Sequence, residues 1–195
     1  MIEVKVLRII AGKYRGRKLK TLSGRHTRPT TDKIKESIFQ RLGPFFSGGT
    51  CLDLFSGSGA LGIEALSRGF DRAVFVDNHR QAVQTIRHNI QLLKLSQEQA
   101  TILQSDAFHA LRRLNRQGKV FQMIFIDPPY YEIDFSKLLT EISEQALLSP
   151  DGIVYCEHGV DEILPKQVAH LTRYNQFSYG KTTSISLYHN DRESD

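Results

Sequence analysis

The sequence predicts a Rossmann-like α/β fold with a mostly parallel seven-stranded sheet and a C-terminal antiparallel hairpin. From Thr50 onward, apolar runs of strand length alternate with segments of helical periodicity. The first apolar run ends in a glycine-rich turn, and acidic residues stand at or near the ends of the first four runs. Repeated strand–helix units require a parallel sheet covered by helices on both faces, and an antiparallel pair is a common edge for such a sheet.

The residues before Thr50 lie outside this alternation, and we expect them to form an extension of residues 1–46. Val4–Ile10 and Arg17–Leu22 are predicted to be two short strands, joined by a turn that the glycines between them permit. Thr30 or Thr31 is placed to cap a helix that runs to about Leu42, where Gly43-Pro44 stops it. The main domain is expected to span residues 47–190, followed by a frayed polar tail of residues 191–195.

The elements of the main domain are predicted in a regular order. The strands are expected at Thr50–Phe55, Arg72–Asp77, Ala100–Gln104, Phe121–Asp127 and Gly152–Cys156, with a closing hairpin of His170–Tyr179 and Thr183–Tyr188. The helices are expected at Ala60–Arg68, His79–Leu93, Ala107–Asn115 and Phe135–Ala146, with a short turn or helix near Asp161–Lys166.

The composition is that of an ordinary globular protein. The chain has 195 residues, of which 40% are hydrophobic and 24% charged, and no apolar stretch is long enough to span a membrane. Cys51 and Cys156 both lie in apolar strand-like runs, which favours reduced, buried thiols in a cytoplasmic protein over a disulfide between adjacent strands. The seven histidines are scattered, so no metal site is expected.

Positive charge is concentrated in the N-terminal segment. Between Val4 and Thr31 there are nine basic residues and no acidic one, whereas the rest of the chain has a slight acidic excess. A basic segment on a mildly acidic body is typical of a protein that binds a polyanion, although such runs are often only solvated surface. The candidate contacts to a nucleic acid are Arg8, Lys13, Arg15, Arg17, Lys18, Lys20 and Arg25.

The first strand of the main domain leads into Ser56-Gly57-Ser58-Gly59-Ala60-Leu61-Gly62. Gly57 and Gly59 permit a tight turn and a close approach of a ligand to the backbone, and Gly62 lets the helix pack near the sheet. The same spacing occurs in dinucleotide sites, so an NAD-dependent dehydrogenase is a rival interpretation. A phosphate-binding P-loop is excluded because no Gly-Lys-Ser/Thr follows. A glycine-rich turn without a ligand also stays open.

The acidic residues after the strands favour S-adenosylmethionine over NAD. Asp53 precedes the glycines, where its carboxylate would pair with a cationic amino group and repel a pyrophosphate. Asp77 is suited to ribose hydroxyls in either cofactor, and Asp106 is placed to accept from an adenine amino group or only to cap the next helix. The predicted cofactor residues of this half are Asp53, Phe55, Gly57, Gly59, Asp77, Asp106 and Ala107.

The box Asp127-Pro128-Pro129-Tyr130 follows the fourth strand. Two prolines force a stiff turn with free carbonyls beside one carboxylate and one ring, although acidic, proline-rich turns also occur at plain surface loops. At the sheet edge that holds the glycine loop, Asp127 and the Pro128 carbonyl would accept hydrogen bonds from both N–H groups of an exocyclic amine. Its lone pair would then face a sulfonium methyl, while Tyr130 stacks on the base. Tyr131 either lines this pocket or lies on the loop, and Glu157-His158 after the fifth strand is a lesser candidate.

Over nearly its whole length the chain resembles the RsmD family of 16S rRNA guanine-N2 methyltransferases. The matching segments are Arg8–Lys13, Gly16–Leu19, Arg28–Lys33 with Glu36 and Phe39, Asp53–Gly59, Asp77, Asp106–Phe108 and Asp127–Tyr130. The Arg-Pro-Thr segment and the Gly-Arg-Lys-Leu run are the specific parts, because the glycine loop and the Asp-Pro-Pro-Tyr box fit many amino-methyltransferases. Gln40 departs from the family, whose members often have Asn there.

The resemblance implies a class I S-adenosylmethionine-dependent methyltransferase that modifies N2 of one guanine, conventionally numbered 966, in 16S rRNA. The substrate would be the small ribosomal subunit or an assembly intermediate. Arg28 and Thr30 would pack over the cofactor, and the basic hairpin would follow the RNA backbone. The protein is expected to be a cytoplasmic monomer with no membrane partner. Two alternatives stay open: an adenine-N6 methyltransferase on DNA or RNA, and a non-catalytic RNA-binding assembly protein.

Overall fold

The computed structural model describes residues 7–22, 32–129 and 133–192. The helices are α1 (Asp32–Leu42), α2 (Ala60–Ser67), α3 (Arg80–Leu92), α4 (Ala107–Arg116) and α5 (Phe135–Glu144). The strands are β1 (Leu7–Arg8), β2 (Lys18–Leu19), β3 (Thr50–Asp53), β4 (Arg72–Asp77), β5 (Ala100–Gln104), β6 (Phe121–Ile126), β7 (Leu148–Gly159), β8 (Gln167–Val168), β9 (Leu171–Tyr179) and β10 (Thr183–Asn190). Within these residues, no helix is long and apolar enough to cross a membrane.

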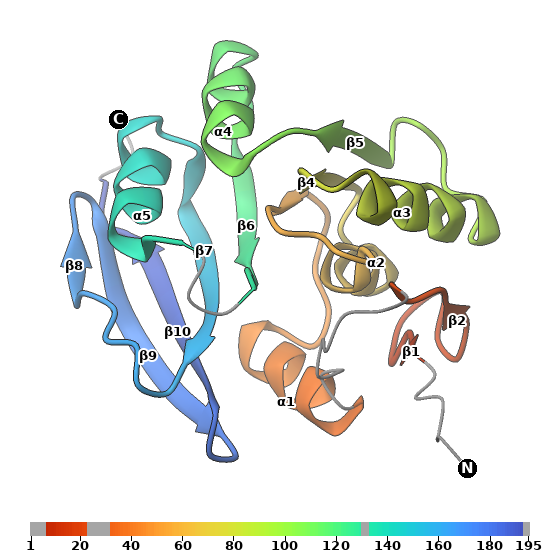
Figure 1. Cartoon of the computed structure of the whole chain (residues 1–195), viewed down its shortest axis with the longest axis horizontal. Coiled ribbons are helices and arrows are strands. Elements are labelled where there is room, and N and C mark those ends of the chain that lie inside the picture. Colours follow the sequence, from red (N-terminus) through yellow and green to blue (C-terminus); the bar gives the residue numbers. More distant parts are fainter. Residues whose placement is uncertain (1–6, 23–31, 130–132, 193–195) are drawn as a thin grey trace.

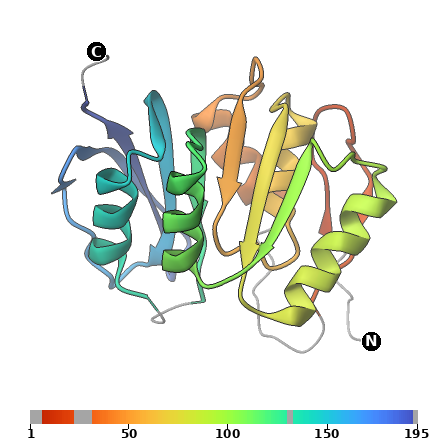
Figure 2. The same cartoon turned by 90° about the horizontal axis from the view of Figure 1, so that it is seen from above.

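The main sheet has the strand order β5-β4-β3-β6-β7-β10-β9-β8, and its strands lie side by side in Figure 2. Strands β3 to β7 pair in parallel, and β10, β9 and β8 continue the sheet in antiparallel fashion. The predicted Rossmann-like fold with a closing antiparallel hairpin is therefore confirmed. The central strands are continuous apolar runs because helices bury both of their faces.

Helices cover the two faces of the sheet in different sets. Figure 1 shows α4 and α5 on one face and α1 and α2 on the other. Alternate residues of β6 divide between the two cores: Ile124 and Ile126 pack with α4 and α5, whereas Met123 and Phe125 pack with α1 and α2. Residues that share a face with Phe125 are consequently on the same side of the sheet as α1.

The C-terminal half differs from the sequence prediction in two places. The fifth strand of the main domain, β7, is longer than the predicted Gly152–Cys156, because β10 pairs with it from Ile153 to Gly159. Near Asp161–Lys166, where a short turn or helix is predicted, the turn is present, and an extended segment follows it into β8. The two-residue strand β8 makes the sheet eight-stranded rather than seven-stranded, and it is too short to show any periodicity in the sequence.

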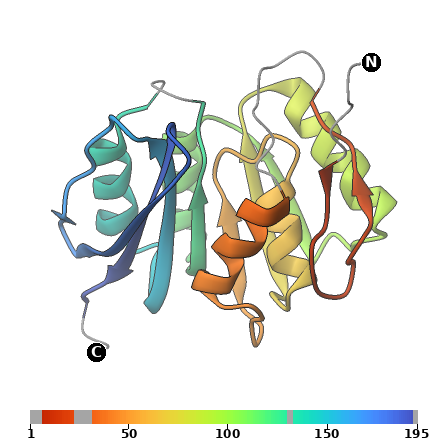
Figure 3. The same ribbon diagram turned by 90° about the horizontal axis from the view of Figure 1, so that it is seen from below.

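The predicted N-terminal hairpin is present, with shorter strands than expected, and it lies along α2 (Figure 3). Its turn docks on the C-terminal end of that helix: the Lys13 amide donates to the Ser67 carbonyl at 2.7 Å, and the Tyr14 amide donates to Ser67 Oγ at 2.9 Å. Gly12 has a φ of +81°, and a Cβ there would lie 1.7 Å from the Ser67 carbonyl oxygen. Only glycine permits this approach.

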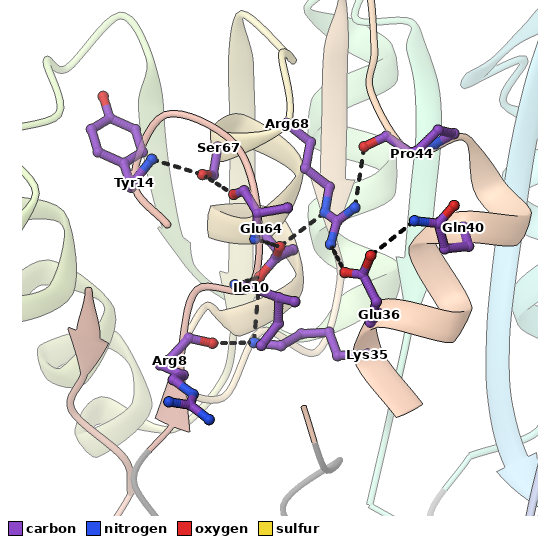
Figure 4. A network of polar contacts seen from close by, with 11 residues as sticks. Arg8, Ile10, Tyr14, Lys35, Glu36, Gln40, Pro44, Glu64, Ser67 and Arg68 are labelled. Atoms are coloured by element: carbon purple, nitrogen blue, oxygen red, sulfur yellow. Dashed lines mark hydrogen bonds and ion pairs between the residues drawn. The ribbon is translucent and has the colours of Figure 1, made fainter. Parts of the chain in front are cut away.

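A buried ionic network joins the hairpin, α1 and α2 (Figure 4). Glu64 of α2 is fully buried and accepts from the amides of Ile10 and Ala11 at 2.9 and 3.0 Å. Its carboxylate also pairs with Lys35 Nζ of α1 at 3.5 Å and with Arg68 Nε at 2.9 Å. The hairpin and α1 are thus held to α2 by paired, buried charges, while the proposed domain boundary at residue 46 remains a prediction.

Candidate active site

The carboxyl ends of β3 and β6 form the switch point of the sheet. The chain proceeds from β3 to β4 and β5 on one side and then returns to place β6 on the other side of β3. Ligands of open α/β sheets bind in the crevice outside such a point. Asp53 is the last residue of β3, and Asp127 directly follows β6. Asp77 ends β4 and Asp106 follows β5, so the structure brings all four acids to one edge.

The glycine loop between β3 and α2 is tightly tied to the sheet. Gly57 and Gly59 have φ values of +53° and +80°, which a side chain would strain. The Ser56 hydroxyl donates to the Asp53 carbonyl at 2.6 Å and accepts from the Val76 amide at 2.9 Å, which joins the loop to β4. A Cβ at Gly62 would lie 2.5 Å from the Phe75 ring, so this glycine does allow α2 to pack close to the sheet.

Asp53 is held beneath this loop. Its side chain is 2% exposed, and its Oδ2 accepts from the Gly62 amide at 3.0 Å. Burial raises the pKa of Asp53 to about 7, the Gly62 bond offsets part of that rise, and the charge of Asp77 adds to it. Asp53 therefore fixes the start of α2 and brings an acidic group under the loop. A direct contact with a ligand amino group remains a proposal.

The remaining predicted cofactor residues line the same edge. Asp77 accepts from the amides of Gly57 and His79, both at 2.9 Å, so it joins the glycine loop to the start of α3. Asp106 is exposed and caps α4 by accepting from the His109 amide at 2.9 Å through Oδ1. The helix-cap interpretation of Asp106 is thus realised, and its Oδ2 is the oxygen left for an adenine contact. Ala107 is buried at the start of α4, and Phe55 is half-buried against the α4 and α5 core.

The box after β6 lies opposite the glycine loop. Asp127 is half-buried, Pro128 is buried and Pro129 is exposed. Burial raises the pKa of Asp127 well above its usual range, and the negative charges of Glu157 and then Asp53 raise it further. The structure records no hydrogen bond to the Asp127 carboxylate in the described part of the chain. The oxygens of Asp127 are therefore not engaged by any of the residues that the structure describes.

Glu157, only a lesser candidate in the sequence, stands next to Asp127. Its side chain is 9% exposed and accepts from the Tyr155 hydroxyl at 2.9 Å through Oε2. Burial raises the pKa of Glu157, and the Tyr155 hydrogen bond lowers it in part. The neighbouring His158 faces the other side, where its ring contacts the Gly159 carbonyl and Ser186 Oγ, both at 2.9 Å. Sequence reasoning missed Tyr155; the available signal was an acid two residues further along an apolar strand.

The basic residues extend away from this edge. Arg8, Lys13, Arg15, Arg17, Lys18 and Lys20 are all exposed. Lys20 is nearest the glycine loop, because Asn89 accepts from its amide and also donates to the Ser58 carbonyl. Arg17 Nη2 donates to the Leu92 carbonyl at 3.1 Å, at the far end of α3. The basic surface therefore runs along the α2 side, from the loop towards the opposite edge of the sheet.

Four predicted site residues lie outside the described residues. These are Arg25, Arg28, Thr30 and Tyr130. Tyr131 also lies outside them, so its two interpretations stay as they were.

Comparison with known proteins places the chain among methyltransferase-like proteins. The sequence model of the family described as conserved hypothetical protein 95 matches residues 7–189. A Bacillus subtilis protein, YlbH, is 45% identical over 182 residues, covering 93% of this chain and 98% of its own. A Haemophilus influenzae protein named ribosomal RNA small subunit methyltransferase D is 36% identical, covering 81% of each chain.

A solved structure of a hypothetical protein from Thermus thermophilus has the same fold. Its TM-score is 0.78 at 30% identity, over 93% of this chain and 98% of that one.

Proposed function

The chain belongs to the RsmD family, and on that premise we propose that it transfers a methyl group from S-adenosylmethionine to N2 of one guanine in 16S rRNA, at position 966. The substrate class is supported by the relative named as a small-subunit rRNA methyltransferase. The observation that carries the chemistry is the placement of Asp127-Pro128 across the switch point from Asp53 and the glycine loop.

The residues at the carboxyl ends of β3, β4 and β5 fit S-adenosylmethionine. Gly57 and Gly59 hold a backbone that a ligand can approach closely, and Asp77 presents a partly exposed carboxylate at the end of β4. Asp106 and Ala107 lie where an adenine ring would be bracketed, and the buried acid Asp53 suits a cationic amino group better than a pyrophosphate. The cofactor supplies an electrophilic methyl on a sulfonium, which is already a good leaving group.

The residues after β6 would orient the guanine amine that accepts the methyl group. An exocyclic amine is a poor nucleophile because its lone pair is delocalised into the base. If Asp127 and the Pro128 carbonyl accepted hydrogen bonds from its two N–H groups, the lone pair would be directed at the methyl group, and Asp127 could take the proton that the amine loses as the new N–C bond forms. Tyr130, outside the described residues, would stack on the base.

The test uses unmodified small subunits, free rRNA and duplex DNA with labelled S-adenosylmethionine, followed by mass-spectrometric mapping of the modified nucleotide. We expect label at N2 of a single guanine in the small-subunit rRNA. Asp127→Ala should abolish methylation and leave RNA affinity unchanged, whereas Asp151→Asn, an exposed acid near the start of β7, should change neither. Label in adenine alone would establish the adenine-N6 alternative, and full activity of Asp127→Ala would refute the catalytic assignment.

A further inference from the structure

The parallel register of β6 and β7 brings Asp127 and Glu157 together. Phe125 pairs with Tyr155 and Ile126 pairs with Cys156, so the next pair along the two strands is Asp127 and Glu157. Side chains alternate between the faces of a sheet, which puts both acids on the face shared by Phe125 and Tyr155. Those two rings contact each other with centroids 5.8 Å apart. The two carboxylates consequently stand side by side above a packed aromatic pair.

Glu157 is positioned rather than free to rotate. The fully buried Tyr155 donates its hydroxyl to Glu157 Oε2 at 2.9 Å, which leaves Oε1 available. In the described part of the chain, no buried side-chain oxygen lacks a hydrogen-bond partner. The open oxygens of Glu157 and Asp127 must therefore be accessible from outside, where a ligand can contact them.

Among the residues that the structure describes, no cation lies close enough to Asp127 or Glu157 to lower the pKa of either one by its charge, so donors from a ligand would complement the two acids. The negative charge of each carboxylate makes ionisation of the other less favourable, and burial makes it less favourable still. Burial raises the pKa of Glu157 and the Tyr155 hydrogen bond offsets part of that rise, while the geometry of that bond leaves Oε1 open to accept. The complementary ligand presents two neighbouring N–H groups to this pair.

Guanine has such an edge and adenine does not. Guanine carries the N1–H donor directly beside its N2 amine, whereas the amine of adenine lies beside the bare acceptor N1. An ionised carboxylate opposite N1 attracts guanine and repels the lone pair of adenine, and a site built to accept an N–H rejects analogues that lack it.

We propose that Glu157, held by Tyr155, accepts the N1–H of the target guanine while Asp127 binds its N2 amine, so that this pair of carboxylates selects guanine over adenine. The inference rests on the proposed function and supplies the base identity that the Asp-Pro-Pro-Tyr box alone leaves open. Glu157 is thus a specificity-determining residue that touches the substrate base.

The experiment replaces the target guanine by 2-aminopurine in small subunits reconstituted with synthetic rRNA. 2-Aminopurine keeps the 2-amine but lacks both N1–H and O6, so the part of the preference that depends on Glu157 reports the N1–H contact. Wild-type protein should favour guanine by about 10- to 150-fold in kcat/KM, the range expected for one hydrogen bond to a charged group. Glu157→Leu should collapse the ratio to within about threefold, mainly through slower reaction of guanine. Glu157→Gln, whose amide oxygen can still accept a hydrogen bond, should keep a preference for guanine between those of the wild type and Glu157→Leu.

Two controls make the result decisive. Glu162→Leu removes a carboxylate five residues further along, after β7, and should leave the ratio as in the wild type. Tyr155→Phe removes the bond that positions Glu157 and should lower the ratio in part, even if Glu157→Leu folds poorly. An unchanged ratio in both Glu157→Leu and Tyr155→Phe, with guanine still methylated, overturns this inference alone. If the wild-type protein methylates no guanine, the proposed function is wrong, and the inference that rests on it is wrong as well.

Discussion

Replacing Glu64 by glutamine tests whether buried charge holds the N-terminal segment on the main domain. The substitution keeps the shape of the side chain but removes the anion shared by Lys35 and Arg68, whose side chains are 2% and 1% exposed. It also turns one carboxylate oxygen into a donor amid the amides of Ile10 and Ala11. Removing one partner from a buried ion pair costs about 3–5 kcal/mol. For a protein of this size, that cost lowers Tm by about 6–20 °C.

The assay is equilibrium unfolding in urea, followed by circular dichroism, together with hydrogen exchange at the amides of Ile10 and Ala11. The exchange of these two amides should accelerate more than that of β3 and β6. The matched control is Glu36→Gln, because Glu36 also pairs with Arg68, at 2.6 Å, but is 38% exposed. A pair that is partly in water contributes about 1 kcal/mol or less. Equal losses of about 1 kcal/mol in both variants would refute the claim that this network anchors the hairpin.

Three further predictions address the site and the hairpin. Because the folded protein raises the pKa of Asp53 to about 7, it binds a proton that the unfolded chain releases near pH 4, so the free energy of unfolding should fall as pH rises from about 4 to about 7. Asp53→Asn should remove that part of the slope in thermal melts, and an unaltered slope would contradict the assignment. Gly12→Ala should lower Tm more than Gly16→Ala, since both residues have φ near +80° but only the first would place Cβ against Ser67; equal shifts would disprove the docking. Neutralising Arg15, Arg17 and Lys18 to Gln should weaken RNA binding and reduce its logarithmic salt slope by about 2, whereas the same change at the exposed α4-side residues Arg113, Arg116 and Lys119 should do neither. If the first triple variant keeps the affinity and the salt slope of the wild type, the basic hairpin does not bind RNA.

The central strands were predictable because their burial on both faces leaves a clear signal. The bounds of β4 and β5 agree with the sequence prediction residue for residue, and β6 differs from it only by the final Asp127. Strands β4 and β6 are dense apolar runs with an aspartate at or directly after their last residue, so local composition decides their limits. Strand β5 lies at the edge of the sheet and is partly exposed, and its limits follow instead from the helical periodicity on either side of it. The glycine loop was equally clear, since positive φ values at Gly57 and Gly59 require the residue type that the sequence has there.

The parts that escaped prediction depend on contacts between distant segments. Strand β8 exists only because Gln167 and Val168 meet the start of β9, and two residues carry no periodic pattern. From the sequence, Glu64 would be expected to lie on the exposed face of a short helix. It is instead fully buried, because Lys35, Arg68 and two hairpin amides surround its carboxylate. Only Arg68, four residues further along at the end of α2, is a local partner of Glu64; the hairpin amides lie 53 and 54 positions away, and Lys35 comes from α1.

The same distinction applies to the chemistry of the site. The Asp-Pro-Pro-Tyr box is a local motif, and in the proposed mechanism its groups would bind the exocyclic amine of either purine. Base identity needs a second acceptor at a fixed distance from the first, and that acceptor comes from the neighbouring strand. It is the register of β6 against β7, set by the pairing of Ile126 with Cys156, that puts Glu157 rather than His158 beside Asp127. A shift of one residue would exchange the two side chains between faces and present an imidazole to the base. In this protein, specificity for guanine would therefore be a property of strand pairing, whereas reactivity towards an amine is a property of the motif.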